Sequence, residues 1–140
     1  MTGFLLDTNV PSELTRLRPE ARVVHWLDAQ NNERLFLSVV TLGEIRKGVT
    51  LLVDSKRRSQ LEQWFIEELL SWFAGRILPV TQAIADRWGV LDATSQRRGT
   101  PLNTADGLIA ATALEHGLTL VTRNARDFAD LGVSLFNPWE

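Results

Sequence analysis

The chain alternates between short apolar runs and longer stretches in which apolar side chains recur every three or four residues. The short runs end in polar or turn-forming residues, as Leu5 and Leu6 do before Asp7. Apolar runs bounded in this way predict strands. The runs that predict strands cover residues 3–6, 35–38, 76–80, 118–122 and 133–136.

The longer stretches have the spacing of amphipathic helices. Residues 41–44 form a Thr-x-x-Glu pattern, which is typical of a helix N-terminus and predicts that a helix begins at Thr41. Gly75 and Gly117 stand where two of the helices should end. The predicted helices cover residues 19–30, 41–53, 61–73, 81–96 and 104–115, with a short helix near Pro11 and a helical turn over residues 124–128.

Strands and helices therefore alternate along nearly the whole chain. Parallel strands need a crossover connection, which is usually a helix. The order predicts an α/β fold, specifically a three-layer α/β/α sandwich with a central parallel sheet. In open sheets of this kind ligands bind beyond the carboxyl ends of the strands, so candidate chemistry is expected there.

The composition narrows that chemistry. With 140 residues, 44% of them hydrophobic, the chain is expected to form a single domain over residues 1–140. The absence of cysteine excludes disulfides, zinc–thiolate sites and thiol catalysis, and two histidines argue against a histidine-rich metal site. Neither a signal-like start nor an apolar stretch of membrane-spanning length is present, so a cytoplasmic protein is expected.

The net charge of −2 argues against tight, sequence-blind binding of nucleic acid over the whole surface. Basic residues nevertheless gather locally. The clusters are Lys56 to Arg58, Arg97 with Arg98, and Arg123 with Arg126. They are consistent with a basic path beside an acidic centre and equally with solvated helix faces, and the sequence leaves both interpretations open.

Four acidic residues fall at the expected edge of the predicted sheet. Asp7 follows the first strand, Glu44 follows the second by a few residues, Asp106 opens the helix over residues 104–115, and Asp127 follows the strand over residues 118–122. Carboxylates a few ångströms apart repel one another strongly in a poorly solvated cleft. A bound divalent cation is the usual remedy, and oxygen ligands without histidine or cysteine favour Mg²⁺ or Mn²⁺.

Each acid also has a structural interpretation. Asp7 is a possible helix cap, and Glu44 is a possible capping-box partner of Thr41. Asp106 and Asp127 each lie three residues after an asparagine, where the helix dipole favours an acid. Asp106, however, shares a helical stripe with apolar residues and therefore points toward the apolar side of its helix, where a carboxylate needs a cation or a hydrogen-bond network. Asp7 and Asp106 are thus the strongest candidate ligands.

The motifs that contain these acids resemble, in order, those of PIN-domain proteins, and most closely the VapC-type toxins of bacterial toxin–antitoxin systems. The resemblance extends from one end of the chain to the other, although any one motif alone is weak. The matching segments are residues 5–9, 41–45, 103–113 and 122–128, together with residues 75–79 and 136–139.

This resemblance implies a Mg²⁺-dependent endoribonuclease, with Mn²⁺ able to substitute. Asp7, Glu44 and Asp106 match the family's catalytic, metal-binding acids. Some relatives carry a fourth acid where this chain has Asn124, and others carry it where Asp127 stands. The implied mechanism binds Mg²⁺ through Asp7 and Asp106 and uses Glu44 as a ligand or as a base for water.

The resemblance also implies partners. These are a small antitoxin protein that covers the acidic site, a second copy of the chain in a homodimer, and a structured RNA substrate such as a tRNA or rRNA. Contact with DNA is expected only through the antitoxin, and no membrane association is expected. The polar residues Thr8, Ser38, Thr122 and Asn124 are possible holders of water or phosphate. The aromatic residues Trp64, Phe65, Trp72 and Phe73 are expected in the core or a dimer surface.

Two other functions remain open from the sequence. A phosphatase with an aspartyl nucleophile fits a similar sheet, but such enzymes typically carry a second Asp two residues after the first, where this chain has Asn9. A non-catalytic binding module with a degenerate acidic site is the second alternative, which Asn124 supports weakly.

Overall fold

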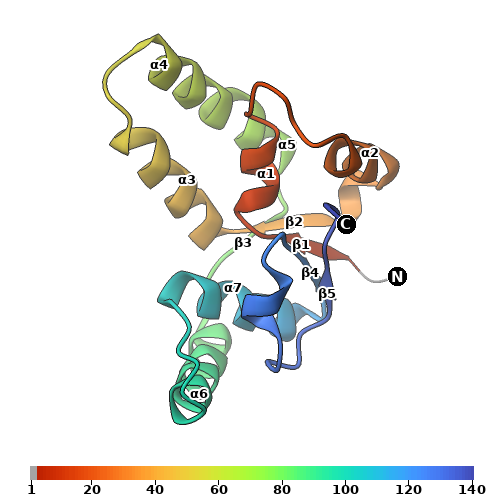
Figure 1. Cartoon of the computed structure of the whole chain (residues 1–140), viewed down its shortest axis with the longest axis vertical. Coiled ribbons are helices and arrows are strands. Elements are labelled where there is room, and N and C mark those ends of the chain that lie inside the picture. The colour runs from red at the N-terminus through yellow and green to blue at the C-terminus, as the bar shows by residue number, and fades with distance from the viewer. Residues whose placement is uncertain (1–2) are drawn as a thin grey trace.

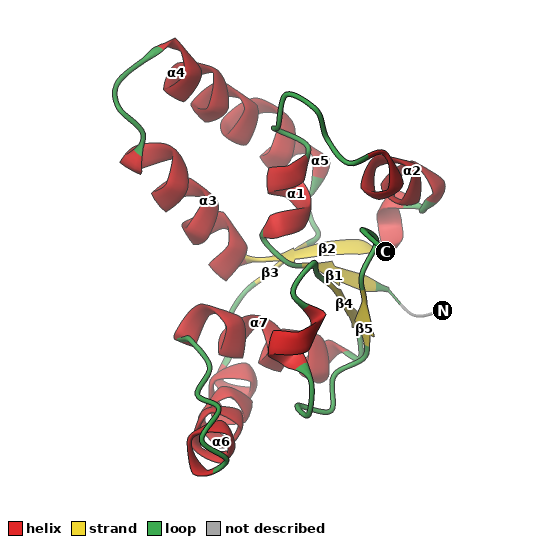
Figure 2. Cartoon of the chain, viewed as in Figure 1, coloured by secondary structure: helices red, strands yellow, loops and turns green. Residues whose placement is uncertain are grey.

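The computed structural model describes residues 3–140 and places one parallel sheet at the centre of the molecule, with helices on both faces (Figures 1 and 2). The sheet has five strands in the order β3–β2–β1–β4–β5, and every neighbouring pair is parallel. The strands are β1 (Phe4–Leu6), β2 (Leu35–Ser38), β3 (Ile77–Leu78), β4 (Thr119–Val121) and β5 (Leu135–Phe136). This arrangement confirms the predicted α/β/α sandwich.

The helices divide between the two faces of the sheet. In Figure 1, α1 to α5 lie on one side of it, and α6, α7 and the 3-10 helix η3 lie on the other. The bounds are α1 (Asn9–Glu13), α2 (Ala21–Ala29), α3 (Val39–Leu51), α4 (Lys56–Gln63), α5 (Leu70–Trp72), α6 (Gln82–Arg97) and α7 (Thr104–His116), with η1 (Asn32–Arg34), η2 (Trp64–Leu69) and η3 (Ala125–Phe128) as 3-10 or π segments. Among residues 3–140, no helix is both long and apolar enough to cross a membrane.

The hydrophobic core consists of two clusters, one on each face of the sheet. Successive residues of a strand point to opposite faces, so Leu6 packs in the cluster beneath α1 to α5 whereas Leu5 packs in the cluster beneath α7. Strand β4 divides in the same way, with Val121 in the first cluster and Leu120 in the second. Burial on both faces explains why the strand runs are apolar throughout instead of alternating.

Helix α3 begins earlier than its Thr-x-x-Glu pattern predicts. Its N-cap is Ser38, whose Oγ accepts a hydrogen bond from the Val40 N–H at 3.0 Å. Thr41 therefore lies inside the first turn and is fully buried, and Glu44 lies beyond that turn. The interpretation of Thr41 and Glu44 as a capping box is wrong, which removes the structural explanation for the carboxylate of Glu44.

The amphipathic stretch predicted over residues 61–73 is part of a longer helical run that begins at Lys56 after the N-cap Ser55. The run passes through the π-helical segment η2 before it ends at Trp72 in α5. Phe65 and Phe73 are buried in the first core cluster, and Trp64 and Trp72 pack against it. The aromatic stripe is mainly core, as one of the two interpretations from the sequence expected.

Candidate active site

Asp7 follows the central strand β1 and is the most buried of the four candidate acids, with 4% of its surface exposed. Its backbone N–H donates to the Val121 carbonyl at 2.9 Å, which continues the pairing between β1 and β4. Its carboxylate accepts hydrogen bonds from the Thr122 hydroxyl at 2.7 Å and the Thr8 N–H at 2.8 Å. Asp7 does not cap α1, because the N-cap residue of that helix is Thr8. The sheet itself therefore fixes this carboxylate.

Glu44 reaches the same region from α3. Its Oε1 atom accepts a hydrogen bond from the Thr8 hydroxyl at 2.5 Å, and that hydroxyl also lies 3.2 Å from the hydroxyl of Thr41. Because Thr8 is covalently next to Asp7, this contact joins the end of β1 to α3. One carboxylate oxygen of Glu44 is thereby oriented, and Oε2 remains for another partner.

Asp106 lies in the first turn of α7 and has two roles. Its N–H donates to the side-chain oxygen of the N-cap residue Asn103 at 2.8 Å, and the Asn103 amide donates back to Asp106 Oδ2 at 3.0 Å. The helix-start interpretation of Asp106 is therefore confirmed. The side chain is also half-buried and feels the charges of the other acids, so its capping role does not separate it from them.

The acids perturb one another electrostatically. Burial raises the pKa of Asp7, its hydrogen bonds to Thr122 and Thr8 offset part of that rise, and the negative charges of Glu44 and Asp127 add to it. Burial, followed by the charges of Asp7, Glu44 and Asp127, raises the pKa of Asp106 to about 6. Four carboxylates from different parts of the chain thus share one electrostatic environment, as the sequence predicted.

Two exposed residues, Asn124 and Asp127, stand where relatives of the family carry a fourth acid. Asp127 lies in η3 and contributes negative charge to both Asp7 and Asp106. The Asn124 N–H donates to the Thr122 hydroxyl at 3.0 Å, but the Asn124 side chain does not cap η3. Asn124 stands at the N-cap position of η3 without a side-chain capping bond, and Asp127 lies in the first turn, as the helix-start interpretation expected; of the two residues, Asp127 carries the charge.

The chemistry of these donors, though not their present spacing, suits a hard divalent cation. The ligands are oxygen atoms, two of the carboxyls have raised pKa values, and within residues 3–140 none of the four acids forms an ion pair with Lys, Arg or His. In the same described region, no three Asp, Glu or His side chains lie close enough together to hold one ion. The protein thus gathers negative charge without compensating it, and a bound cation would offset the repulsion.

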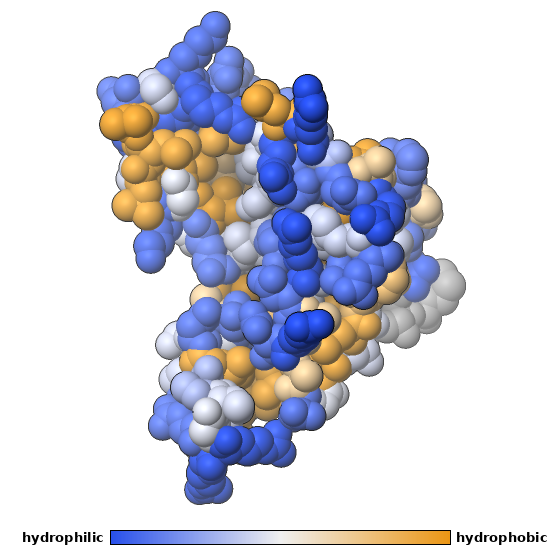
Figure 3. Space-filling view, in the orientation of Figure 1, coloured by the Kyte–Doolittle hydropathy of each residue, from blue (hydrophilic) through white to orange (hydrophobic). Residues whose placement is uncertain are grey.

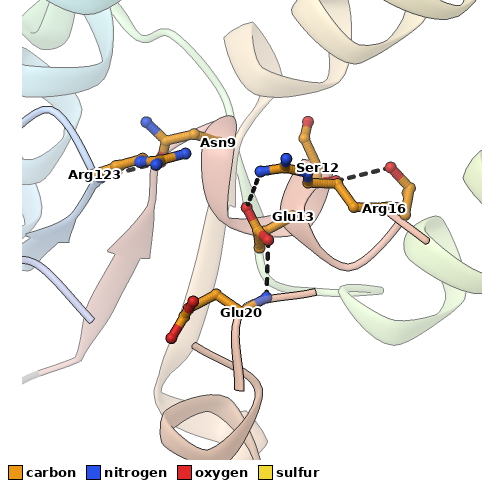
Figure 4. Close-up of polar contacts among 7 residues, drawn as sticks. Asn9, Ser12, Glu13, Arg16, Glu20 and Arg123 are labelled. Atoms are coloured by element: carbon orange, nitrogen blue, oxygen red, sulfur yellow. Dashed lines mark hydrogen bonds and ion pairs between the residues drawn. The ribbon is translucent and has the colours of Figure 1, made fainter. Parts of the chain in front are cut away.

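Glu13 is a further buried acid, which the sequence interpretation missed (Figure 4). One of its oxygens lies 3.3 Å from Arg16 Nη1, and the other accepts the Glu20 N–H at 2.9 Å. Burial acts to raise the pKa of Glu13, but these two partners outweigh it and lower the pKa. Glu13 therefore ties the end of α1 to the start of α2 and is compensated, in contrast to the acids around Asp7.

Sequence reasoning gave Thr8 and Thr122 only a minor place, as possible holders of water or phosphate. The structure makes them the direct hydrogen-bond partners of Glu44 and Asp7. Their positions beside acidic motifs were visible in the sequence, but their partners were not. Ser38, another residue of that group, caps α3 instead.

A parallel α/β/α sandwich with an uncompensated group of carboxylates at the carboxyl ends of its strands defines a class of divalent-metal-dependent hydrolases. The family model of the PIN domain matches residues 4–133, and the chain belongs to this family.

Similar proteins cover almost the whole chain. Toxin FitB of Neisseria gonorrhoeae is 42% identical over 97% of this chain and 98% of its own length. VapC ribonuclease Y4jK of Sinorhizobium fredii is 39% identical over 98% of both chains, and a tRNA(fMet)-specific endonuclease VapC of Salmonella typhimurium is 30% identical over 91% of both.

Solved structures agree with these matches. FitAcB from Neisseria gonorrhoeae has a TM-score of 0.91 and 42% identity over 98% of this chain and 99% of the matched chain. DNA-bound VapBC from Salmonella typhimurium has a TM-score of 0.82 and 27% identity over all of both chains. The likeness thus includes the fold as well as the sequence.

Proposed function

We propose that this protein is the toxin component of a type II toxin–antitoxin system and acts as an endoribonuclease that requires a divalent cation. The observation that carries the proposal is the buried carboxylate of Asp7, held at the end of the central strand among three other acids. Within residues 3–140, no Lys, Arg or His forms an ion pair with any of them. The relatives named as ribonucleases support RNA as the substrate. Mg²⁺ is the proposed ion, and Mn²⁺ is expected to substitute.

In the proposed mechanism, Asp7 and Asp106 hold the cation and Glu44 is a further ligand or the base. Mg²⁺, when bound, would lower the pKa of water and offset the charge that develops on the phosphodiester. Thr122 and Thr8 hold Asp7 in place, and Thr8 also orients Glu44 so that its Oε2 atom is available to accept a proton from the attacking water. In-line attack on phosphorus leaves 5′-phosphate and 3′-hydroxyl ends. Asp127 adds its negative charge to that of the other acids, whereas Asn124 can contribute only a neutral amide oxygen.

The two alternative functions have less support. Asn9 stands where an aspartyl-phosphate enzyme typically has its second carboxylate. The Asn9 amide lies within 3.4 Å of both Asp7 Oδ2 and the Thr122 hydroxyl, where it acts as a hydrogen-bond donor. A degenerate binding module has no need for the uncompensated charge that Asp7, Glu44 and Asp106 keep.

The proposed partners are a small antitoxin that covers the acidic site, a second copy of the chain, and DNA only through the antitoxin. The end of α3 and the connection to α4 expose Leu51, Leu52 and Val53, with 76%, 38% and 83% of their surfaces accessible. Figure 3 shows apolar side chains gathered on this part of the viewed face. An exposed group of this kind suits a protein interface. The solved FitAB and VapBC assemblies support such partners.

Substitution of the central acids tests the catalytic proposal. Asp7→Asn and Asp106→Asn each keep the side-chain volume but remove the charge that holds the cation, so each is expected to lower the cleavage rate by at least a hundredfold. The measurement is RNA cleavage with Mg²⁺ and with EDTA, together with circular dichroism to verify folding. Asp86→Asn, on the exposed surface of α6, is the matched control and should cleave as the wild type does. Wild-type cleavage by either central variant would refute the proposal.

A further inference from the structure

A cavity of about 400 Å³ opens beside the acidic site, on the face of the sheet that α6 and α7 cover. Its walls come from the C-terminal end of α6, the connection between α6 and α7, the first turn of α7, and η3 with the residues that follow. Asp106 and Asp127 line this cavity and also belong to the acidic group around Asp7. A ligand that fills the α6–α7 cavity therefore lies next to the proposed catalytic acids.

Two arginines, Arg98 and Arg126, line the same cavity. Arg98 caps the end of α6, and its Nη1 atom donates to the Asp130 carbonyl at 2.8 Å. Arg126, in η3, is exposed, and within residues 3–140 its guanidinium has no hydrogen bond or ion pair, although Asp127 is its chain neighbour. An unengaged guanidinium beside an acidic cleavage site is suited to a phosphate of the substrate.

The rest of the lining is mixed. Leu102 and Leu131 contribute apolar surface, and Ser95 and Thr100 contribute hydroxyl groups. A cavity of this volume admits a small organic ligand. Apolar surface next to planar guanidinium groups and hydroxyls suits an unstacked base with its sugar, which is how proteins bind single-stranded RNA.

We propose that the α6–α7 cavity binds the nucleotide that flanks the scissile phosphodiester, with Arg126 on the phosphate of that nucleotide. This inference rests on the proposed ribonuclease function and adds a binding subsite to it. Arg126 offsets the repulsion that the RNA backbone meets on approaching Asp106 and Asp127. The walls of the cavity, Thr100 among them, then select the base at one position next to the cut by their shape, and Arg126 is the residue that binds the phosphate.

The first test maps cleaved RNA ends across the transcriptome after induced expression of the wild type and of variants. Thr100→Trp fills the cavity and is expected to change the base preference at one position next to the cut while the other positions keep theirs. Thr100→Ala leaves the cavity open and is its matched control. Cleavage by Thr100→Trp with an unchanged preference at every position would refute the subsite. If the wild type produced no cleaved ends, the ribonuclease proposal itself would fail.

The second test measures binding without catalysis. Fluorescence anisotropy in EDTA follows a labelled RNA fragment that spans the mapped cut site. Removal of one phosphate contact to single-stranded RNA lowers the slope of log K against log salt by about 0.7. Arg126→Ala is expected to show this change and to weaken binding by roughly tenfold at low salt.

Arg97→Ala is the control for the binding test, because Arg97 is exposed on the same side of the molecule but does not line the cavity. Equal slopes and affinities for Arg126→Ala and Arg97→Ala would refute the proposal. The proposal would also be refuted if Arg126→Ala bound RNA normally but was no longer neutralised by the antitoxin. That result would mean that the cavity binds a segment of the antitoxin.

Discussion

Asp106 illustrates how the environment of one residue links the site to the stability of the fold. Its pKa is raised to about 6, from 3.8, by burial and by the charges of Asp7, Glu44 and Asp127. A raised pKa means that the folded protein binds this proton more tightly than the unfolded chain does. The stabilisation is therefore fully present below about pH 4 and is lost as the pH rises to about 6.

The first prediction at this scale concerns that pH window. In EDTA, Asp106→Asn is expected to gain Tm relative to the wild type as the pH rises from about 4 to about 6, because the amide avoids the cost of ionisation. Acids that both proteins share, such as Glu13, contribute equally to the two Tm values, so their contributions cancel in the difference. Asp86→Asn should show no such trend. A constant difference for Asp106→Asn over this range would contradict the pKa assignment.

The second prediction concerns the hydroxyl of Thr122, which donates to the buried carboxylate of Asp7 at 2.7 Å. Thr122→Val keeps the shape of the side chain but removes this donor and the acceptor for the Asn124 N–H. The expected loss is about 1–3 kcal/mol of unfolding free energy, with reduced RNA cleavage. Denaturant unfolding and cleavage assays measure both. Thr122→Ser retains the hydroxyl and should recover most of each, and failure to recover would show that the methyl group is what matters.

At the scale of the element, α3 shows how a single side chain sets the start of a helix and so the position of Glu44, one of the proposed catalytic residues. Ser38 ends β2 and caps α3, so that the strand passes directly into the helix. Glu44 then faces Thr8 across the end of the sheet. A start at Thr41 would instead have turned the Glu44 carboxylate back toward the N–H of Thr41, as in a capping box.

A prediction follows for this cap. Ser38→Ala removes the oxygen that accepts the Val40 N–H, and the expected cost is about 1 kcal/mol of unfolding free energy. Chemical denaturation measures the change. Ser71→Ala, at an exposed position of α5 without a capping bond, should alter stability by less than about 0.5 kcal/mol. A neutral Ser38→Ala variant would place the start of α3 elsewhere.

At the scale of the whole molecule, the sheet brings distant acids together. Asp7 and Thr122 are 115 residues apart in sequence, yet they are hydrogen-bonded because β1 pairs with β4. Glu44 and Asp106 arrive on helices that cover opposite faces of the same sheet. The resulting excess of negative charge favours cation binding by the folded protein, whereas the unfolded chain disperses the same acids.

Cation binding should therefore stabilise the fold. Mn²⁺ or Mg²⁺ is expected to raise the Tm in a concentration-dependent manner, equivalent to about 2.7 kcal/mol when the free ion reaches a hundred times its Kd. Thermal unfolding with increasing metal measures the effect. Asp7→Asn should abolish it and Asp86→Asn should retain it. An equal rise in Asp7→Asn would mean that the ion binds elsewhere.

Much of this architecture was predictable because hydrophobic periodicity is a local property. Every predicted strand is present within a few residues of its expected bounds, and the end of α7 falls at Gly117, whose φ of 63° favours glycine. The sequence made Asp7, at the end of a strand, and Asp106, on the apolar side of a helix, the strongest candidate ligands. In the structure the pKa values of both carboxyls are raised. The start of α3 was mispredicted because Ser38 and Thr41 are both suitable N-cap residues. The local sequence does not show that Thr41 is buried inside the first turn.

The sequence by itself determined the order of strands and helices, the family motifs, and a chemistry without thiolate ligands, because the chain has no cysteine. The tertiary structure decided which side chains meet. It brought the Thr122 hydroxyl to Asp7 and the Thr8 hydroxyl to Glu44. It also left Arg126 without a partner among residues 3–140, at the wall of a cavity beside Asp106. These contacts depend on strand order, on register and on how helices pack across the sheet, which are long-range properties that no local pattern encodes.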